Sequence, residues 1–193
     1  IATVAHRKNI VLNLNGKNVT GTDMTTTNFS IIDNRGNLTI TGPGTITLTA
    51  QNNNGWERYS AVVANNPGGL LTIDADVTIE HLGGTDMAYG IDNLTNGKGT
   101  SAVTVINGAT VKSPYRAVRQ FLNGIEADNT LIVKAGSTLD GKNKSIFFQD
   151  PSTYANTGTL IVEEGATLNG DVYLFVTEGS TEWPVEVSIA ASS

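Results

Sequence analysis

The stretch Gly69–Thr95, GLLTIDADVTIEHLGGTDMAYGIDNLT, decides the fold that we expect for this chain. Apolar residues alternate with polar ones in three short runs, at 70–73, 77–82 and 89–95. Alternation with a period of two is the pattern of a half-buried strand, and the Gly and Asp residues between the runs are typical of turns. The stretch therefore predicts three strands joined by tight corners.

The same three-strand pattern recurs along the whole chain. Aligned on the first strand, successive copies begin 25 to 33 residues apart, and a period in this range is typical of a solenoid. In this alignment Asn93, Gln120 and Gln149 share one column near the end of the third strand. Because parallel coils lie about 4.8 Å apart, we expect these amides to form a hydrogen-bonded ladder. The first strands of the copies begin at Leu12, Leu38, Leu71, Val103, Leu131, Leu160 and Val185.

The predicted fold is all-β, a single-stranded right-handed parallel β-helix of about six coils with three short strands per coil. Residues 1–193 are expected to form one domain. Two alternatives compete with this interpretation. Residues 116–125 show apolar spacing typical of a helix, but the repeat places a strand there. A β-sandwich also contains many short strands, but it need not repeat one order of strands and corners in a fixed phase.

Composition narrows the possible functions. The chain has a net charge of −6 and no cluster of Lys and Arg, so nucleic acid is disfavoured as a partner. It contains no cysteine, which excludes disulfides and thiol chemistry. No apolar run approaches the roughly 18 residues that cross a bilayer, so membrane insertion is not expected.

Two segments carry a resemblance to a known family. The runs LNLNGKNVTG at 12–21 and GNLTITGPGTITL at 36–48 resemble the repeated segments of pectin-lyase-like β-helices in large surface proteins of gut Firmicutes. The resemblance implies a bacterial module located at the cell surface or outside the cell. It also implies neighbouring domains, and because the chain begins at Ile1 we expect a segment of a larger exported protein.

The leading functional hypothesis is a rigid, non-enzymatic module for adhesion or carbohydrate binding. Flat aromatic side chains spaced along a solenoid can stack on sugar rings, while adjacent Arg and amide groups supply hydrogen bonds. The partner would be a polysaccharide or a host or cell-surface glycan. A purely structural spacer, which would bury these aromatic residues, is a third hypothesis. The candidate binding residues are Trp56, Arg58, Tyr59, Tyr89, Tyr115 and Arg116.

The second functional hypothesis is a polysaccharide lyase or hydrolase, the activity that the resemblance implies. Its candidate catalytic residues are Asp92, Lys112, Arg116 and Arg119. The plainer interpretation is that Asp92 and Arg119 form a surface ion pair between neighbouring coils, worth about 0–1 kcal/mol.

We expect no cofactor, with Ca²⁺ as the one ion considered. Asp74 and Asp76, with Glu80 nearby, are weak candidates for a Ca²⁺ site because carboxylate oxygens suit that ion. Carboxylates two residues apart beside a corner are more often simply solvated.

Overall fold

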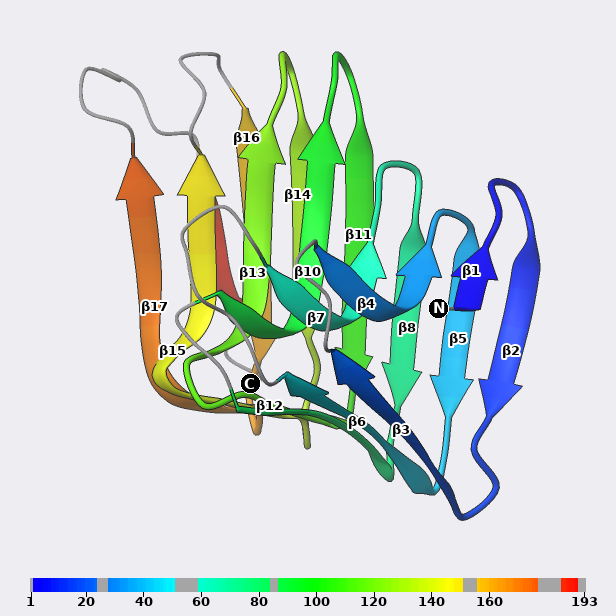
Figure 1. Cartoon of the computed structure of the whole chain (residues 1–193). Helices are drawn as coiled ribbons and strands as arrows, with labels where there is room; N and C mark the ends of the chain where they lie inside the picture. The colour runs from blue at the N-terminus through cyan, green and yellow to red at the C-terminus, as the bar shows by residue number, and fades with distance from the viewer. Residues whose placement is uncertain are drawn as a thin grey trace.

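The chain folds as a parallel β-solenoid of about five turns, close to the six coils expected. This is a computed structural model, and it describes residues 2–23, 28–50, 59–83, 87–150, 156–176 and 185–190. Every regular element within these ranges is a strand (Figure 1). The described ranges contain no helix long and apolar enough to cross a membrane.

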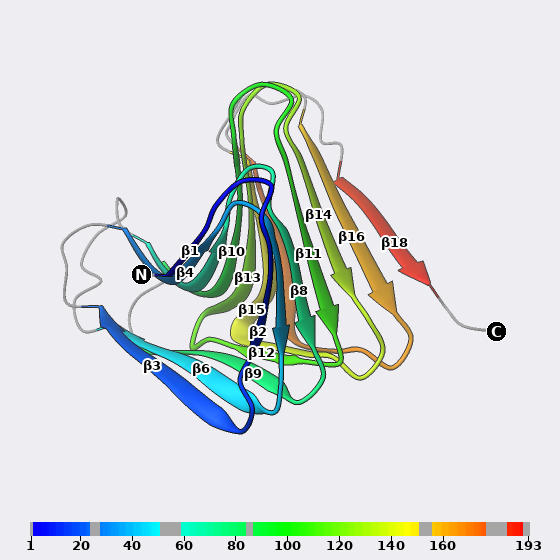
Figure 2. The ribbon, with the colours of Figure 1, turned by 90° about the vertical axis from the view of Figure 1, so that its right-hand side faces the viewer.

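Viewed along its axis, the solenoid has a triangular cross-section with three walls (Figure 2). The first wall is a seven-stranded sheet of β2 (Asn9–Asn13), β5 (Asn37–Thr41), β8 (Leu70–Asp74), β11 (Ser101–Asn107), β14 (Asp128–Val133), β16 (Thr157–Glu163) and β18 (Val185–Ala190). The second wall contains β3 (Lys17–Asp23), β6 (Gly44–Ala50), β9 (Val77–Leu82) and β12 (Thr110–Lys112). The third wall contains β1 (Ala2–Val4), β4 (Phe29–Asn34), β7 (Ser60–Asn65), β10 (Ala88–Asn96) and β13 (Arg116–Asn123).

Two long strands join the second and third walls. β15 (Thr138–Asp150) pairs with β12 through its first residues and with β13 through its last ones. β17 (Thr167–Val176) follows β15 along its length. The two walls therefore form one 11-stranded sheet that bends around the core.

The core consists of apolar ladders that run along the axis. Leu38 faces Leu71 in the first wall, and Ile46 faces Ile79 in the second. These four side chains are at most 2% exposed. Burying a side chain of this size contributes about 1.5–3 kcal/mol, so the alternating pattern read in the sequence carries most of the stability.

The corners between the first and second walls use backbone conformations that favour glycine. Gly16, Gly108, Gly136 and Gly165 have φ values of 74°, 80°, 77° and 85° at this corner, and Asp76 has 64°. A residue with a Cβ is strained at positive φ, whereas Gly is not. The prediction that Gly marks these corners is confirmed.

The amide ladder is present, with a different membership from the one predicted. Side-chain N–H groups donate from Asn34 to Asn65 over 2.8 Å, from Asn65 to Asn93 over 2.9 Å and from Asn93 to Gln120 over 2.6 Å. All four amides are fully buried. Gln149 lies outside the ladder.

The membership differs because β15 departs from the simple repeat. It pairs with both β12 and β13 at a constant offset of 28 residues, as in Thr110 with Thr138 and Gln120 with Phe148, one residue fewer than the sequence alignment assumed. Phe148 rather than Gln149 therefore stands opposite Gln120. The prediction that Gln149 belongs to the ladder was therefore wrong. The side-chain amide nitrogen of Gln120 has no hydrogen-bond partner among the described residues.

A second register difference occurs in the first wall. Thr104, not Val103, stands opposite Leu71 and Leu131 in the core column. A buried hydroxyl is costly unless it is hydrogen-bonded, and here Asn65 Nδ2 donates to Thr104 Oγ1 over 3.1 Å. The amide ladder thus explains why a polar residue occupies this inward position.

Candidate functional site

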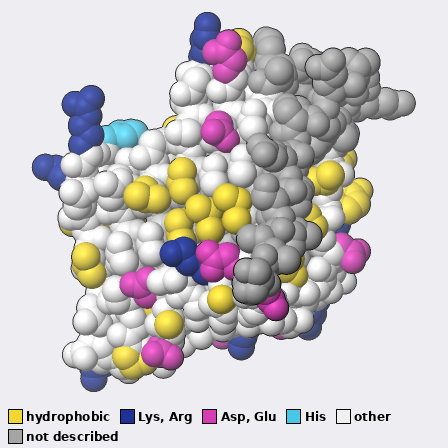
Figure 3. All heavy atoms as spheres, turned by 180° about the vertical axis from the view of Figure 1, so that it is seen from behind, with side chains coloured by type: hydrophobic (Ala, Val, Ile, Leu, Met, Phe, Trp, Pro, Cys, Tyr) yellow, Lys and Arg dark blue, Asp and Glu magenta, His cyan; other side chains and the backbone are white. Residues whose placement is uncertain are grey.

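The outer face of the first wall carries aliphatic rather than aromatic side chains. Figure 3 shows this face, with hydrophobic side chains gathered near its centre. Its outward positions include the half-buried Val105, Ile132 and Ile161 in one row, and Leu70, which is 38% exposed. The described residues of this face include no aromatic ring that a sugar could stack on.

The third wall differs, because its outer face combines charges with aromatic rings. Strand alternation and parallel stacking place residues of equal register one above another along the axis. One column contains Asp92, Arg119, Phe147 and Tyr173 in successive coils. The flanking columns add two further sets, Tyr89, Arg116 and Lys144 on one side and Phe121, Gln149 and Phe175 on the other.

Asp92 and Arg119 form a two-pronged ion pair between neighbouring coils. Arg119 Nε donates to Asp92 Oδ1 over 2.7 Å, and Arg119 Nη2 donates to Oδ2 over 2.5 Å. The ion pair between coils was predicted, but its predicted surface position was wrong, since the two side chains are 0% and 3% exposed. Removing one partner of a buried pair is costly because the remaining charge is desolvated without compensation.

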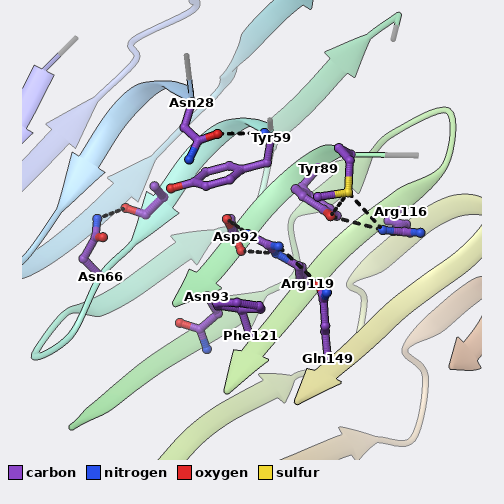
Figure 4. Close-up of polar contacts among 12 residues, drawn as sticks. Asn28, Tyr59, Asn66, Tyr89, Asp92, Asn93, Arg116, Arg119, Phe121 and Gln149 are labelled. Atoms are coloured by element: carbon purple, nitrogen blue, oxygen red, sulfur yellow. Dashed lines mark hydrogen bonds and ion pairs between the residues drawn. The ribbon is translucent and has the colours of Figure 1, made fainter. Parts of the chain in front are cut away.

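Three aromatic rings surround the Arg119 guanidinium (Figure 4). Its Cζ lies 4.5 Å from the ring centres of Tyr89 and Phe121 and 4.9 Å from that of Tyr59. The negative faces of the rings stabilise the cation. Nη1 of Arg119 also donates to Gln149 Oε1 over 3.2 Å, so this arginine is held on every side.

Burial and neighbouring charges together raise the pKa values of Tyr59, Tyr89 and Arg119. Desolvation, helped by the Asp92 carboxylate, raises the pKa of Tyr59 to about 12. Desolvation also raises the pKa of Tyr89, against the opposing effect of Arg119. Burial by itself lowers the pKa of Arg119, but the Asp92 carboxylate outweighs it, so the net pKa is raised. Arg119 and the two phenols therefore keep one charge state across the ordinary pH range.

Arg116 and Lys144 are cations of a different kind. Arg116 is 7% exposed, its Nη1 donates to Tyr89 Oη over 3.1 Å, and its Cζ lies 4.1 Å from the Phe147 ring centre. Lys144 Nζ lies 4.5 Å from the Tyr173 ring centre. Among the described residues, neither cation has a carboxylate within ion-pair distance. Within the described ranges, the two positive charges are therefore positioned by aromatic rings rather than by acidic partners.

These two cations line a hollow of about 290 Å³ on the third wall. Phe147 and Tyr173 stack in its floor, with ring centres 5.8 Å apart and an angle of 23° between their planes. Tyr173 and Phe175 are 43% and 42% exposed. The hollow thus offers open aromatic surface beside two cations and an amide. Its lining comprises Met87, Arg116, Lys144, Phe147, Gln149, Tyr173 and Phe175.

The structure disperses the predicted binding residues. Trp56 and Arg58 lie outside the described residues. Tyr59 and Tyr89 enclose Arg119, and Tyr115 is half-buried and does not line the hollow. Of the described members of the set, Arg116 alone lines it.

The four predicted catalytic residues do not converge on one site. Asp92 and Arg119 are engaged with each other, and Arg116 lines the hollow on the third wall. Lys112 is exposed on β12 and lines a separate hollow of about 210 Å³ with Glu80 and Asp140.

The weak Ca²⁺ candidates are also dispersed. Asp74 Oδ1 accepts a hydrogen bond from Asn107 Nδ2 over 2.9 Å, and Asp76 occupies the exposed corner. Glu80 lies on β9 beside the second hollow. Across the described ranges, no three or more His, Asp or Glu side chains are grouped so that they could hold a metal ion.

The residues of the hollow that sequence reasoning missed come mostly from β15 and β17. The repeat alignment placed Gln149 inward, and with it Phe147 two residues earlier, whereas Ile146 and Phe148 occupy the core and Phe147 lies between them on the outer face. The run Ile146-Phe147-Phe148 contained the signal, because alternation cannot bury all three residues. The pairing of β15 with β13, one residue away from the sequence alignment, decides that Phe147 turns outward.

Comparison with protein-family models, with curated proteins and with solved structures finds no match for this chain. The chain is a β-solenoid by its own structure. What its surface does must be argued from the geometry of the third wall.

Proposed function

We propose that this chain is a non-enzymatic recognition module that binds an anionic carbohydrate on the outer face of the third wall. One observation carries the proposal, namely that two cations with no carboxylate partner among the described residues, Arg116 and Lys144, border a hollow with exposed aromatic rings. A carboxylate or sulfate on a sugar would receive charge-assisted hydrogen bonds from these cations. The apolar face of the same sugar would stack on Tyr173 or Phe175.

The rigid solenoid supports this proposal. Apart from Met87, the lining residues come from strands that are hydrogen-bonded to neighbours in the same sheet, so their spacing is set before any ligand arrives. A preorganised site loses less entropy on binding than a flexible one. A linear polysaccharide lying along the axis would meet coil after coil at regular spacing.

The lining of the hollow favours binding over cleavage. Glycoside hydrolysis normally needs two carboxyl groups on either side of the scissile bond. The described residues that line the hollow include no Asp, Glu or His. A polysaccharide lyase or hydrolase remains the second candidate, supported by the two cations, which would neutralise an acidic sugar. A purely structural spacer is the third.

The family and location belong to the same proposal. The resemblance of 12–21 and 36–48 to pectin-lyase-like repeats, together with the solenoid fold, supports placement among bacterial surface β-helices. An extracellular or cell-surface location would give the module access to glycans. Neighbouring domains of the same chain would hold it in place.

The test compares anionic with neutral polysaccharides by calorimetric titration. Polygalacturonate, alginate and chondroitin sulfate form the anionic set, and mannan and xyloglucan form the neutral set. We expect binding to at least one anionic polymer, and weaker binding at higher salt because the contact is ionic. The same samples are assayed for unsaturated and reducing-end products with and without Ca²⁺, since product formation would favour the enzyme.

Variants locate the site on the hollow. Lys144→Gln removes one cation, and we expect affinity to fall about tenfold, or about 1.4 kcal/mol. Lys142→Gln is the matched control, because Lys142 is exposed nearby but borders the other hollow. Tyr173→Ala should weaken binding through lost stacking. Equal loss in both lysine variants would show that net charge rather than this site binds the polymer. No binding to either polymer set, and no product, would favour the spacer.

A further inference from the structure

Both ends of the solenoid expose strands that are paired on one side. In the described chain β1 pairs with β4 and β2 pairs with β5 at one end, while β17 pairs with β15 and β18 pairs with β16 at the other. The two ends lie at opposite extremes of the stack (Figure 1). Unpaired strand edges are templates for pairing with another chain.

The end coils also expose residues that belong to the core columns. Val172 and Leu174 stand opposite Ile146 and Phe148, which are fully buried, yet they are 39% and 45% exposed. At the other end Ile10 is 46% exposed, although it stands opposite a buried leucine on β5. In the described part of the chain, no further coil covers these apolar surfaces.

The charges of the two ends are opposite in sign. Residues 1–22 contain three basic residues, Arg7, Lys8 and Lys17, and no Asp or Glu. Residues 150–193 contain seven acidic residues and no Lys or Arg. The acidic residues Glu163 and Asp171 lie in the last coils that the structure describes. Surfaces of opposite charge attract each other over about a Debye length, whereas like ends repel.

We propose that a second copy of this chain docks head to tail, with its β1 and β2 extending the ladders beyond β17 and β18. All the strand pairs named above at the two ends are parallel, so a second copy in the same orientation continues the same hydrogen-bond pattern. Continuing the register places Ala2 over Val172 and Val4 over Leu174. The second wall has one strand fewer than the other two, so docking engages the first and third walls.

This contact is heterologous, because it joins two different surfaces of identical copies. Such a contact leaves a free end on each assembly and produces open chains rather than closed dimers. Because the third wall continues from copy to copy, its outer face would be extended rather than covered. The proposal does not depend on what that face binds.

The test uses the 193-residue chain and sedimentation velocity over a range of concentrations. We expect species larger than dimers whose average mass rises with concentration and falls with added salt. Arg7→Glu/Lys8→Glu reverses charge at the basic end, where both side chains are exposed, and should weaken association at least tenfold. Lys98→Glu/Lys142→Glu makes the same charge change at exposed positions of interior coils and should have a smaller effect.

A mixing experiment distinguishes head-to-tail docking from other contacts. Glu163→Lys/Asp171→Lys reverses charge at the acidic end and should also stay dissociated alone. Mixed with Arg7→Glu/Lys8→Glu, it presents complementary ends again, and association should return. The proposal would be overturned if the wild-type protein stays monomeric at every concentration or stops at dimers. It would also be overturned if the mixture of the two charge-reversed variants remains dissociated.

Discussion

Replacing Arg119 by Met tests how the third wall is held together. Met retains much of the apolar stem of Arg, but the substitution leaves the Asp92 carboxylate fully buried without its cation. Loss of one partner of a buried ion pair costs about 3–5 kcal/mol. The three rings within 4.9 Å of the guanidinium lose their cation as well. Since the free energy of unfolding of small domains is about 5–15 kcal/mol, this substitution removes a large fraction of the stability.

The assay is urea unfolding followed by circular dichroism and tyrosine fluorescence, because agreement of two probes checks that one transition is measured. Asp92→Leu/Arg119→Met removes both charges, and we expect it to be more stable than Arg119→Met alone. A cost below about 1 kcal/mol for Arg119→Met would show that the pair behaves as a solvated surface pair. A double variant less stable than the single one would refute the argument that the unpaired buried carboxylate dominates.

Three further predictions concern the core and the buried phenol. Asn93→Ala breaks the buried ladder and should lower the free energy of unfolding by about 1–3 kcal/mol for each amide left without a partner. Asn37→Ala is the control, because it breaks the exposed hydrogen bond between Asn37 and Asn9. It should cost under about 0.5 kcal/mol in the same urea assay. The folded-state pKa of Tyr59 is raised from 10.0 to about 12, so its contribution is fully present below pH 10 and is lost as pH rises towards 12. Tyr59→Phe should therefore lose less unfolding free energy than the wild type between pH 10 and pH 12. An unchanged pH dependence in this range would contradict the raised pKa. Gly158→Ala places a Cβ 2.9 Å from the Phe148 ring and should lower the unfolding free energy by about 1–3 kcal/mol, while a neutral result would show that the ring can move aside.

The candidate site was predicted from the sequence in part. The sequence pattern identified Asp92 and Arg119 as partners in neighbouring coils because equal positions in the repeat stack along the axis. Their burial could not be read from the pattern, since it depends on Tyr59, Tyr89 and Phe121 closing around the guanidinium. The hollow itself was missed.

Alternation and period determined the solenoid from the sequence alone. Most strands of the first wall bury every second residue, and turn-forming residues, mostly Gly, recur at the corners, so both patterns are local and survive without knowledge of contacts. The predictions of an all-β fold and of strand rather than helix at 116–123 are confirmed.

Only the tertiary structure decided the exact register and therefore the surface chemistry. A shift of one residue turns a strand's side chains to the opposite face, and such a shift separates the observed pairing of β15 with β13 from the pairing that the sequence alignment predicted. It moves Phe147 and Gln149 to the outer face beside Arg119, and it places Phe148 in the core opposite Gln120. A repeat can still be recognised when one coil is a residue longer or shorter, but that one residue reverses the face to which each side chain points. The sequence thus determined the coil, and pairing between coils determined which residues the coil presents.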